Sequence, residues 1–181
     1  MGSTLNHPNI ATVYDLGIEG AFPFIVFEYI AGGTLSALLG QRMHAGKPLT
    51  SEEVVRLGLQ LAGGLTHAHR RGVVHGDIKT ENLMLGEEGE LKITDFGISA
   101  LMSEDASLRS IGGTVAYMSP EQIRREPVDH RSDLFSLGVV LYELSTGTLP
   151  FRGAYVSAVE YTILNEAPIA IGSLRSDLAL P

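Results

Sequence analysis

The sequence has no cysteine, so a disulfide framework and a thiolate metal site are both excluded. This absence fits a reducing compartment, and we expect a cytoplasmic protein. Basic residues are also scarce: 13 lysines and arginines stand against 21 acidic residues, which gives a formal net charge of −8. Binding to nucleic acid needs a basic patch. The charge balance therefore argues against nucleic acid as the main partner.

Long apolar runs are missing as well. No stretch approaches the roughly 20 apolar residues of a membrane-spanning helix, and the N-terminal residues Met-Gly-Ser-Thr-Leu-Asn-His have no apolar signal core. We therefore expect no membrane span in this chain. What remains is a chain of 181 residues with 44% hydrophobic content. This is within the size range of one domain and enough to build a packed core.

The most informative stretch is 75–97, where two short apolar strands alternate with polar loops. Asp77, Asn82 and Asp95 are oxygen donors on the loops that flank these strands. Such donors suit Mg²⁺, which takes few protein ligands and completes its shell with water and phosphate oxygens. Lys79 places a positive charge beside the Asp77 carboxylate. A carboxylate, an ammonium group and a divalent metal together are the parts that phosphoryl transfer needs.

The pattern His-Gly-Asp-Ile-Lys-x-x-Asn, followed by Asp-Phe-Gly, resembles the catalytic loop and the metal-binding loop of eukaryotic-type serine/threonine protein kinases. A pair of solvated acids beside a hairpin is the alternative reading. The resemblance implies that Asp77 orients the substrate hydroxyl, that Lys79 neutralises the transferred phosphoryl group, and that Asn82 and Asp95 hold Mg²⁺. It also implies that Thr114 bonds the catalytic aspartate and lysine, that ATP is the cofactor, and that proteins are the substrates.

The resemblance extends to the N-terminal part of the chain. Runs of β-branched and aromatic residues at 12–18 and 22–29 predict a β-hairpin. By resemblance, Phe27 stands at the gatekeeper position, and the backbone of Glu28 and Ile30 forms the hinge that binds adenine. Met84 would form the floor under adenine. For Phe27 and Met84, an ordinary role in the core agrees equally well with the pattern.

Helix signals follow the hinge. Thr34 is a suitable N-cap for a short helix, and the pair Thr50 and Glu53 fits a capping box at the start of a longer one. His67 and His69 are two positions apart and so lie on different faces of that helix. We therefore expect surface or capping roles for them. A buried apolar helix is predicted over 134–144, and Asp133 at its start should bond backbone amides there or in the catalytic loop.

The predicted fold is α+β and similar to a partial protein kinase domain. Residues 1–30 would be the end of the small lobe and the hinge, and 31–181 a mainly helical large lobe that is truncated at its C-terminus. Nothing before Pro8 supplies a glycine-rich loop or a strand lysine. We therefore expect a partner or missing segments to complete the small lobe, and weak or no activity for this chain alone. A catalytically silent lobe that docks proteins is the second hypothesis.

One position departs from the family pattern. Gly76 stands where the resemblance predicts an arginine, just before the catalytic aspartate. In kinases that have it, this arginine can bind a phosphate on the activation segment by a bidentate contact. Glycine has no side chain to do so. Control by phosphorylation of the activation segment is therefore not expected from this sequence.

Overall fold

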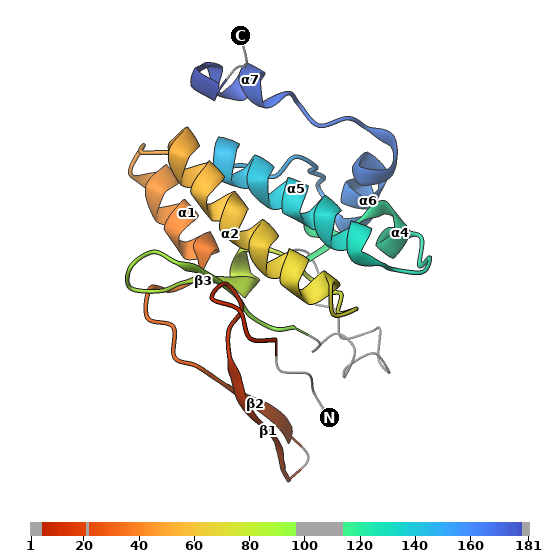
Figure 1. The fold of residues 1–181 in the computed structure, drawn as a ribbon. Helices are drawn as coiled ribbons and strands as arrows, with labels where there is room; N and C mark the ends of the chain where they lie inside the picture. Colours follow the sequence, from red (N-terminus) through yellow and green to blue (C-terminus); the bar gives the residue numbers. More distant parts are fainter. Residues whose placement is uncertain (1–4, 21, 97–113, 179–181) are drawn as a thin grey trace.

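The computed structural model describes residues 5–20, 22–96 and 114–178 (Figure 1). The two sheets of this part are small and the helices form the bulk of it, which confirms the α+β prediction. In chain order, the elements are β1 (Val13–Glu19), β2 (Phe22–Phe27), α1 (Leu35–His44), α2 (Ser51–His69), η1 (Thr80–Asn82), β3 (Leu83–Leu85), β4 (Leu91–Ile93), η3 (Thr114–Tyr117), α4 (Pro120–Ile123), α5 (His130–Thr146), α6 (Val156–Asn165), α7 (Ile171–Leu174) and η4 (Ser176–Leu178), where η marks a 3₁₀ helix.

Strands β1 and β2 form the predicted antiparallel hairpin, in which Leu16 pairs with Ile25 and Gly17 with Phe24. The hairpin extends away from the helices (Figure 1). Its apolar side chains are therefore exposed to a degree that is unusual for strands: Ile18 is 76% exposed and Phe22 77%. An apolar two-stranded ribbon of this kind is marginally stable by itself in water. The hairpin therefore carries apolar surface that the rest of the described chain does not bury.

Helix α2 is the longest element and begins as the sequence predicts. The Thr50 side chain accepts from the Glu53 amide, and the Glu53 side chain accepts from the Thr50 amide, so both halves of the capping box are present. At the other end Gly72 has φ +72°, its amide donates to His69, and Val73 donates to Ala68. This is a Schellman ending, which needs a left-handed residue at the position that glycine occupies.

Helices α2 and α5 lie side by side and form the centre of the helical part (Figure 1). The apolar face of α2 is buried against α5 and the β3–β4 sheet, and Leu57, Leu61 and Leu65 are each 1% exposed. Helix α5 begins earlier than the sequence analysis predicts, at His130, with Asp129 as its N-cap. The first turn of α5 is polar, so the apolar pattern could not show it.

The β3–β4 sheet lies between α1, α2 and the hairpin. Leu83 pairs with Ile93 in antiparallel register, and both side chains are fully buried. Ile93 also accepts the Ala11 amide at 2.9 Å, which ties the base of the hairpin to β4. The sheet therefore connects the hairpin, the helical core and the loops on which the candidate residues lie.

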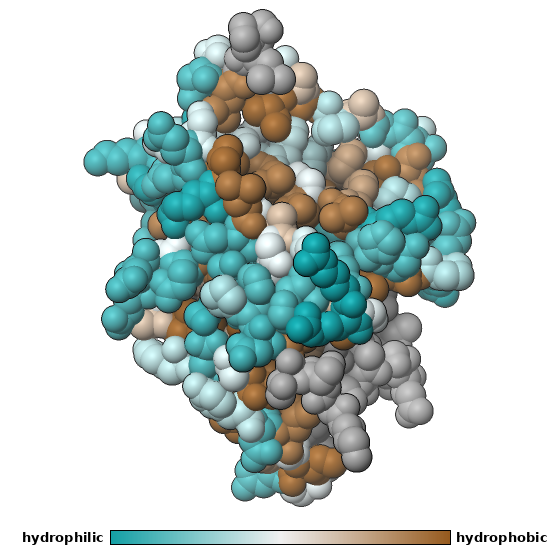
Figure 2. Space-filling model, in the orientation of Figure 1, coloured by the Kyte–Doolittle hydropathy of each residue, from teal (hydrophilic) through white to brown (hydrophobic). Residues whose placement is uncertain are grey.

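Apolar surface gathers in two places in the space-filling view (Figure 2). One is the hairpin, at the bottom of the view. The other is a groove beneath α7, lined by Ser51, Val54, Val55, Ser145, Ile171, Gly172 and Leu178. Within the described ranges, no helix is both long enough and apolar enough to span a bilayer.

Candidate active site

The candidate catalytic loop, residues 75–82, follows α2 and brings three of the candidate residues into one hydrogen-bonded group. The Asp77 carboxylate accepts from the Lys79 ammonium at 2.7 Å and from the Asn82 side-chain amide at 3.1 Å. The same Asn82 nitrogen donates to the Asp77 carbonyl oxygen at 2.8 Å. Asn82 is 8% exposed, whereas the Asp77 and Lys79 side chains are 28% and 18% exposed. The charged pair therefore borders solvent, and the amide supports it from beneath.

The antiparallel pairing of β3 and β4 brings Asp95 beside this group. Asn82 immediately precedes β3, and Thr94 and Asp95 follow β4, so the pairing places these chain ends next to one another. The Thr94 amide and hydroxyl both donate to the Asn82 carbonyl oxygen, at 2.9 and 3.1 Å. Asp95 has φ +64°, a conformation that costs a non-glycine residue about 1–3 kcal/mol. Its surroundings therefore hold it in a strained position, as is common at functional sites.

The donors at this point fit Mg²⁺. Because the Asn82 nitrogen is used within the loop, its Oδ1 is the atom that could face a cation. One amide oxygen and the Asp95 carboxylate are hard donors, and Mg²⁺ often binds one or two carboxylates and keeps several waters. The described residues form no group of three or more His, Cys, Asp or Glu side chains around a common point. A site built for Zn²⁺ would need such a group.

His75 lies beneath the site as a neutral link between its two loops. Its ring is 1% exposed and packs edge-on against Phe96, with 4.6 Å between the ring centroids. Nδ1 accepts the Asp77 amide at 3.2 Å, so Nε2 carries the proton and donates to the Thr94 carbonyl oxygen at 2.8 Å. Burial lowers the pKa of His75 below its ordinary value of 6.5, although the bond to Thr94 acts in the opposite direction. The histidine is therefore a structural support.

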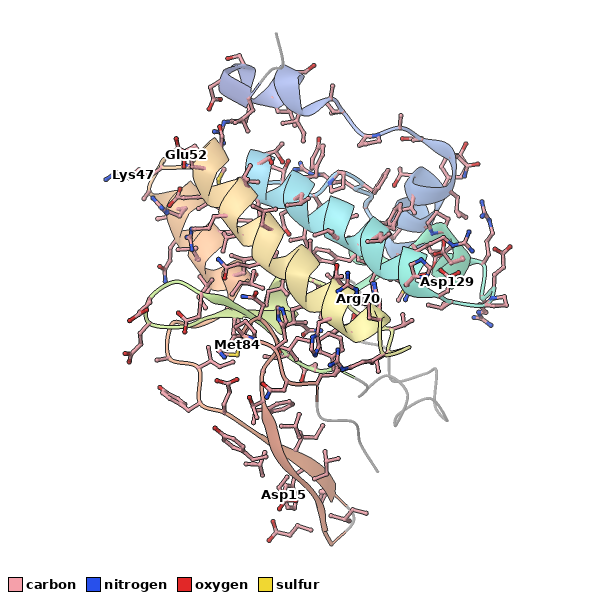
Figure 3. The ribbon with its side chains drawn as sticks, in the orientation of Figure 1. Asp15, Lys47, Glu52, Arg70, Met84 and Asp129 are labelled. Atoms are coloured by element: carbon pink, nitrogen blue, oxygen red, sulfur yellow. The ribbon has the colours of Figure 1, made fainter. Side chains whose placement is uncertain are left out.

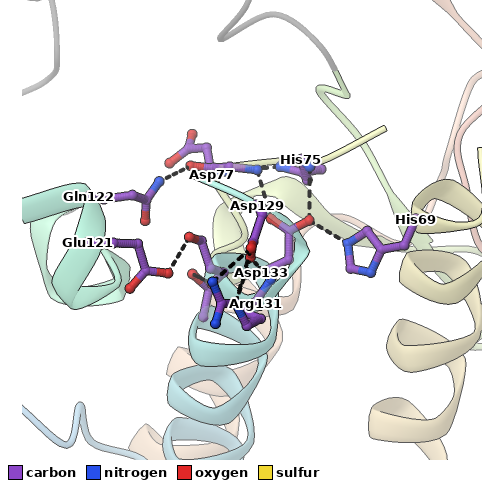
Figure 4. Close-up of polar contacts among 11 residues, drawn as sticks. His69, His75, Asp77, Glu121, Gln122, Asp129, Arg131 and Asp133 are labelled. Atoms are coloured by element: carbon purple, nitrogen blue, oxygen red, sulfur yellow. Dashed lines mark hydrogen bonds and ion pairs between the residues drawn. The ribbon is translucent and has the colours of Figure 1, made fainter. Parts of the chain in front are cut away.

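Asp133 anchors the loop from α5 (Figure 4). Its side chain is completely buried and accepts the backbone amides of His75 at 2.9 Å and of Gly76 at 2.8 Å. Of the two roles expected for this residue, bonding to the catalytic loop is the one the structure shows. His69, on α2, supplies a third bond, with its Nε2 2.7 Å from Asp133 Oδ2. The surface or capping role expected for His69 is therefore incomplete, because the ring also contacts Asp133.

Helix α4 contacts the same loop from the other side. The Gln122 side-chain amide donates to the Gly76 carbonyl oxygen at 2.7 Å. Its neighbour Glu121 accepts the Ser132 hydroxyl at the start of α5. Burial acts to raise the pKa of Glu121, but the bond from Ser132, its other hydrogen bonds and the charge of Arg131 together outweigh burial, and the pKa is lowered. Glu121 lies in the first turn of α4 and, through this contact, joins α4 to α5.

A second buried connection escaped the sequence analysis. The Tyr117 hydroxyl donates to Glu143 on α5 at 2.6 Å and lies 3.0 Å from the hydroxyl of Thr80, which is fully buried. Burial raises the pKa of Glu143, and the bond from Tyr117 offsets this only in part. These residues are far apart in sequence and share no motif, so no sequence signal could pair them. Together they tie η1 and η3 to α5.

The residues assigned to adenine lie where the hairpin meets the β3–β4 sheet. Phe27 ends β2 and pairs with Val13. Ile30 is 8% exposed. Met84 is half-buried in the middle of β3, and its side chain lies on the hairpin side of the sheet (Figure 3). The structure therefore brings these three residues to one region of the fold.

Glu28 has a structural role that the sequence did not indicate. Its carboxylate accepts the Thr12 amide at 2.8 Å and the Lys92 ammonium at 3.0 Å, and its own amide donates to the Thr12 carbonyl oxygen at 2.9 Å. Burial acts to raise the pKa of Glu28, but the bonds from Thr12 and Lys92 lower it below its ordinary value. The Glu28 amide is thus occupied within the protein. The side chain of Thr114 lies outside the part of the chain that the structure describes.

Comparison with known proteins places this geometry in a family. A family model described as "Protein kinase domain" matches residues 1–177. The chain is 43% identical over 164 residues to the serine/threonine-protein kinase PknL of Mycobacterium tuberculosis, an alignment that covers 89% of this chain and 40% of PknL. It is 40% identical over 153 residues to PrkC of Bacillus subtilis, which covers 83% of this chain and 23% of PrkC.

PknB of Mycobacterium leprae is similar to a comparable degree, with 37% identity over 174 residues that cover 92% of this chain and 27% of PknB. The chain thus spans 40% or less of the length of these curated relatives. The family model, by contrast, matches almost the whole chain. The chain belongs to the protein kinase domain family.

Proposed function

We propose that the chain is the central part of a serine/threonine protein kinase, which transfers the γ-phosphoryl group of ATP to Ser or Thr hydroxyls of proteins. One observation carries this proposal: Asp77, Lys79 and Asn82 form a single hydrogen-bonded group, and β3–β4 pairing brings Asp95 next to it. Positioning and charge neutralisation provide most of the catalysis of phosphoryl transfer. Because all four residues are intact, a catalytically silent docking lobe is the less favoured alternative.

Each residue would have a separate role in the reaction. Asp77 would accept a hydrogen bond from the substrate hydroxyl and thereby orient it. Lys79, 2.7 Å from that carboxylate, would neutralise charge on the transferred phosphoryl group. Asn82 and Asp95 would hold Mg²⁺, which neutralises the β- and γ-phosphates when it is bound with ATP. Thr114 would hydrogen-bond the catalytic aspartate and lysine.

Adenine would lie against Met84 and the hinge. Glu28 and Ile30 would bind it through backbone atoms, and Phe27 would close the back of the site. Since the Glu28 amide already donates to Thr12, the hinge contribution of Glu28 would come from its carbonyl oxygen. The Lys92 bond to the Glu28 carboxylate would keep the hinge at a fixed position relative to β4.

The exposed apolar side chains of the hairpin support the proposal that another polypeptide segment completes the small lobe. Residues 1–30 would be the end of that lobe, and 31–181 the large lobe. Further segments of a longer protein, or a partner, would cover the hairpin and supply a phosphate-binding loop and a lysine. Because Gly76 has no side chain, phosphorylation of the activation segment is not part of this proposal. The cytoplasmic location stays a prediction.

Titration of ATP with and without Mg²⁺, by calorimetry or NMR, tests the nucleotide and metal site. We expect binding that depends on Mg²⁺, with a dissociation constant of roughly 0.1–10 mM, because nothing before Pro8 supplies a glycine-rich loop to cover the phosphates. Asp95→Asn should lose most of the Mg²⁺ dependence. Asp15→Asn, an exposed acid on the hairpin, makes the same chemical change away from the site. If Mg²⁺ does not affect the parent, or Asp95→Asn binds Mg·ATP equally well, the metal assignment is wrong.

Radiolabel transfer to a generic basic protein tests the reaction itself. We expect turnover far below the 1–100 per second of ordinary protein kinases, because each missing electrostatic element costs on the order of 10²-fold or more. Asp77→Asn should remove this residual transfer, since the amide is a poor acceptor for the substrate hydroxyl. Residual transfer that is unchanged in Asp77→Asn would contradict the proposed role of Asp77.

A further inference from the structure

The peptide unit that carries Asp77 is held at both of its polar ends. This unit consists of the Gly76 carbonyl and the Asp77 amide, which lie in one plane. The carbonyl oxygen accepts from the Gln122 side chain at 2.7 Å, and the amide donates to His75 Nδ1 at 3.2 Å. Figure 4 shows these contacts on opposite sides of the loop. Rotation of the peptide plane would break both bonds.

Glycine makes this external restraint necessary. Gly76 has φ +74°, and a Cβ atom added there would have no heavy atom within 4 Å. The residue before Asp77 therefore has neither a side chain nor close packing to fix its backbone, and glycine allows a wide range of φ and ψ. Its amide is bound by Asp133 at 2.8 Å, which leaves its carbonyl to be fixed by another group. Gln122 is that group.

Gln122 is itself held in one orientation. Its Oε1 accepts the Ser119 amide at 2.9 Å, in the capping box at the start of α4. Its Nε2 is then directed at the Gly76 carbonyl oxygen. Exchanging the two atoms would place a donor against the Ser119 amide and an oxygen against the carbonyl, so the observed orientation is strongly preferred. The side chain therefore acts as a rigid link from α4 to the catalytic loop.

We propose that Gln122 is a positioning residue for the phosphoryl-transfer reaction: it fixes the Gly76–Asp77 peptide plane and thereby the direction of the Asp77 carboxylate. The inference rests on the proposed kinase function. Gln122 has no role in the chemistry and acts through Gly76. A displacement of about 1 Å in a catalytic group can cost around 10²-fold in rate. Loss of this bond should therefore appear in turnover and leave affinity for ATP nearly unchanged.

Two substitutions separate the link from the helix cap. Gln122→Glu keeps an acceptor for the Ser119 amide but replaces the donor by a second oxygen that repels the Gly76 carbonyl. Gln122→Met keeps the length of the side chain, adds no charge, and removes both functions. Only the loss of the donor is common to the two variants. Gln41→Glu, on the exposed surface of α1, is the control for the added charge.

The residual phosphoryl transfer of the full chain, its KM for ATP and the carbonyl ¹³C shift of Gly76 are then measured. Both Gln122 variants should lose at least about tenfold in kcat, change KM less than about twofold, and shift the Gly76 resonance, whereas Gln41→Glu should match the parent. A parental kcat in both variants overturns the proposal. A loss in Gln122→Met alone would assign Gln122 to the helix cap, and a loss in Gln122→Glu alone would assign the effect to charge; each also overturns it.

Failure of the kinase function itself would be seen separately. If Asp77→Asn transfers phosphate as fast as the parent, then the proposed function is wrong. In that case the Gly76 carbonyl shift and the hydrogen exchange of the Asp77 amide still test the link, because neither needs turnover. An unchanged shift and unchanged exchange in both Gln122 variants would show that Gln122 does not fix this peptide unit.

Discussion

Replacing Asp133 by alanine should destabilise the fold more than any exposed substitution. The carboxylate is fully buried and accepts three bonds, from the backbone amides of His75 and Gly76 and from the ring of His69. Alanine would remove all three acceptor contacts at once. Two backbone donors and a ring nitrogen would then be left in a region from which water is largely excluded.

The magnitude follows from these groups. Each buried donor left without a partner costs about 1–3 kcal/mol. These costs overlap, so we expect Asp133→Ala to lower the free energy of unfolding by roughly 3–5 kcal/mol. Asp133→Asn keeps one acceptor oxygen but turns an NH₂ group toward the remaining donors. A smaller loss of roughly 1–3 kcal/mol is expected for it.

Equilibrium unfolding in urea, followed by circular dichroism, measures these differences. For a slope near 2 kcal/mol/M, a loss of about 4 kcal/mol lowers the midpoint by about 2 M. Glu88→Ala, in the exposed turn between β3 and β4, is the control and should stay within about 0.5 kcal/mol of the parent. The reasoning is refuted if Asp133→Ala loses less than about 1 kcal/mol, or if the asparagine variant is the less stable of the two.

Two further predictions concern the same loop. Gly76→Ala should lower the free energy of unfolding by about 1–2 kcal/mol, because a side chain disfavours φ +74° even where space is open. The control is Gly40→Ala, inside α1 and also with open space, which should instead raise the free energy of unfolding by roughly 0.5–1 kcal/mol in the same urea assay. Burial lowers the pKa of His75, so the unfolded chain binds a proton at this residue more readily than the folded chain. The contribution of the neutral, buried ring to stability is therefore complete above about pH 6.5 and is lost as pH falls below that value. The titration midpoint of the His75 ring resonances should therefore lie below 6.5, and a midpoint at or above 6.5 would contradict the effect of burial.

Local sequence rules predicted the features that are formed by neighbouring residues. The Thr50 and Glu53 capping box depends on residues three positions apart, and the structure shows both of its bonds. The approach of Asn82 to Asp95 follows from two short strands joined by a tight turn, which almost fixes the antiparallel pairing. For such features the chain between the partners is too short to allow many alternatives.

Local patterns did not predict most contacts between distant residues, and the bond from Asp133 to the catalytic loop was only one of two expected alternatives. His69 reaches Asp133 across 64 positions, and Gln122 reaches Gly76 across 46. Each contact exists only because α2, α4 and α5 pack around one loop, and helical periodicity predicts the packed face of a helix but not its partner. A surface or capping role was expected for His69, and its bond to Asp133 was therefore not predicted.

The exposed hairpin has a consequence for handling this polypeptide. Strands β1 and β2 present unpaired edges together with bare apolar side chains, among them Ile18 and Phe22. Proteins that remain monomeric usually blunt such edges with lysine, proline or a covering element. Strand β2 contains one proline, Pro23, but neither strand contains a lysine. At high concentration, copies of the chain should therefore adhere to one another through their hairpins. Solubility would then be limited by these 13 residues and not by the helical part.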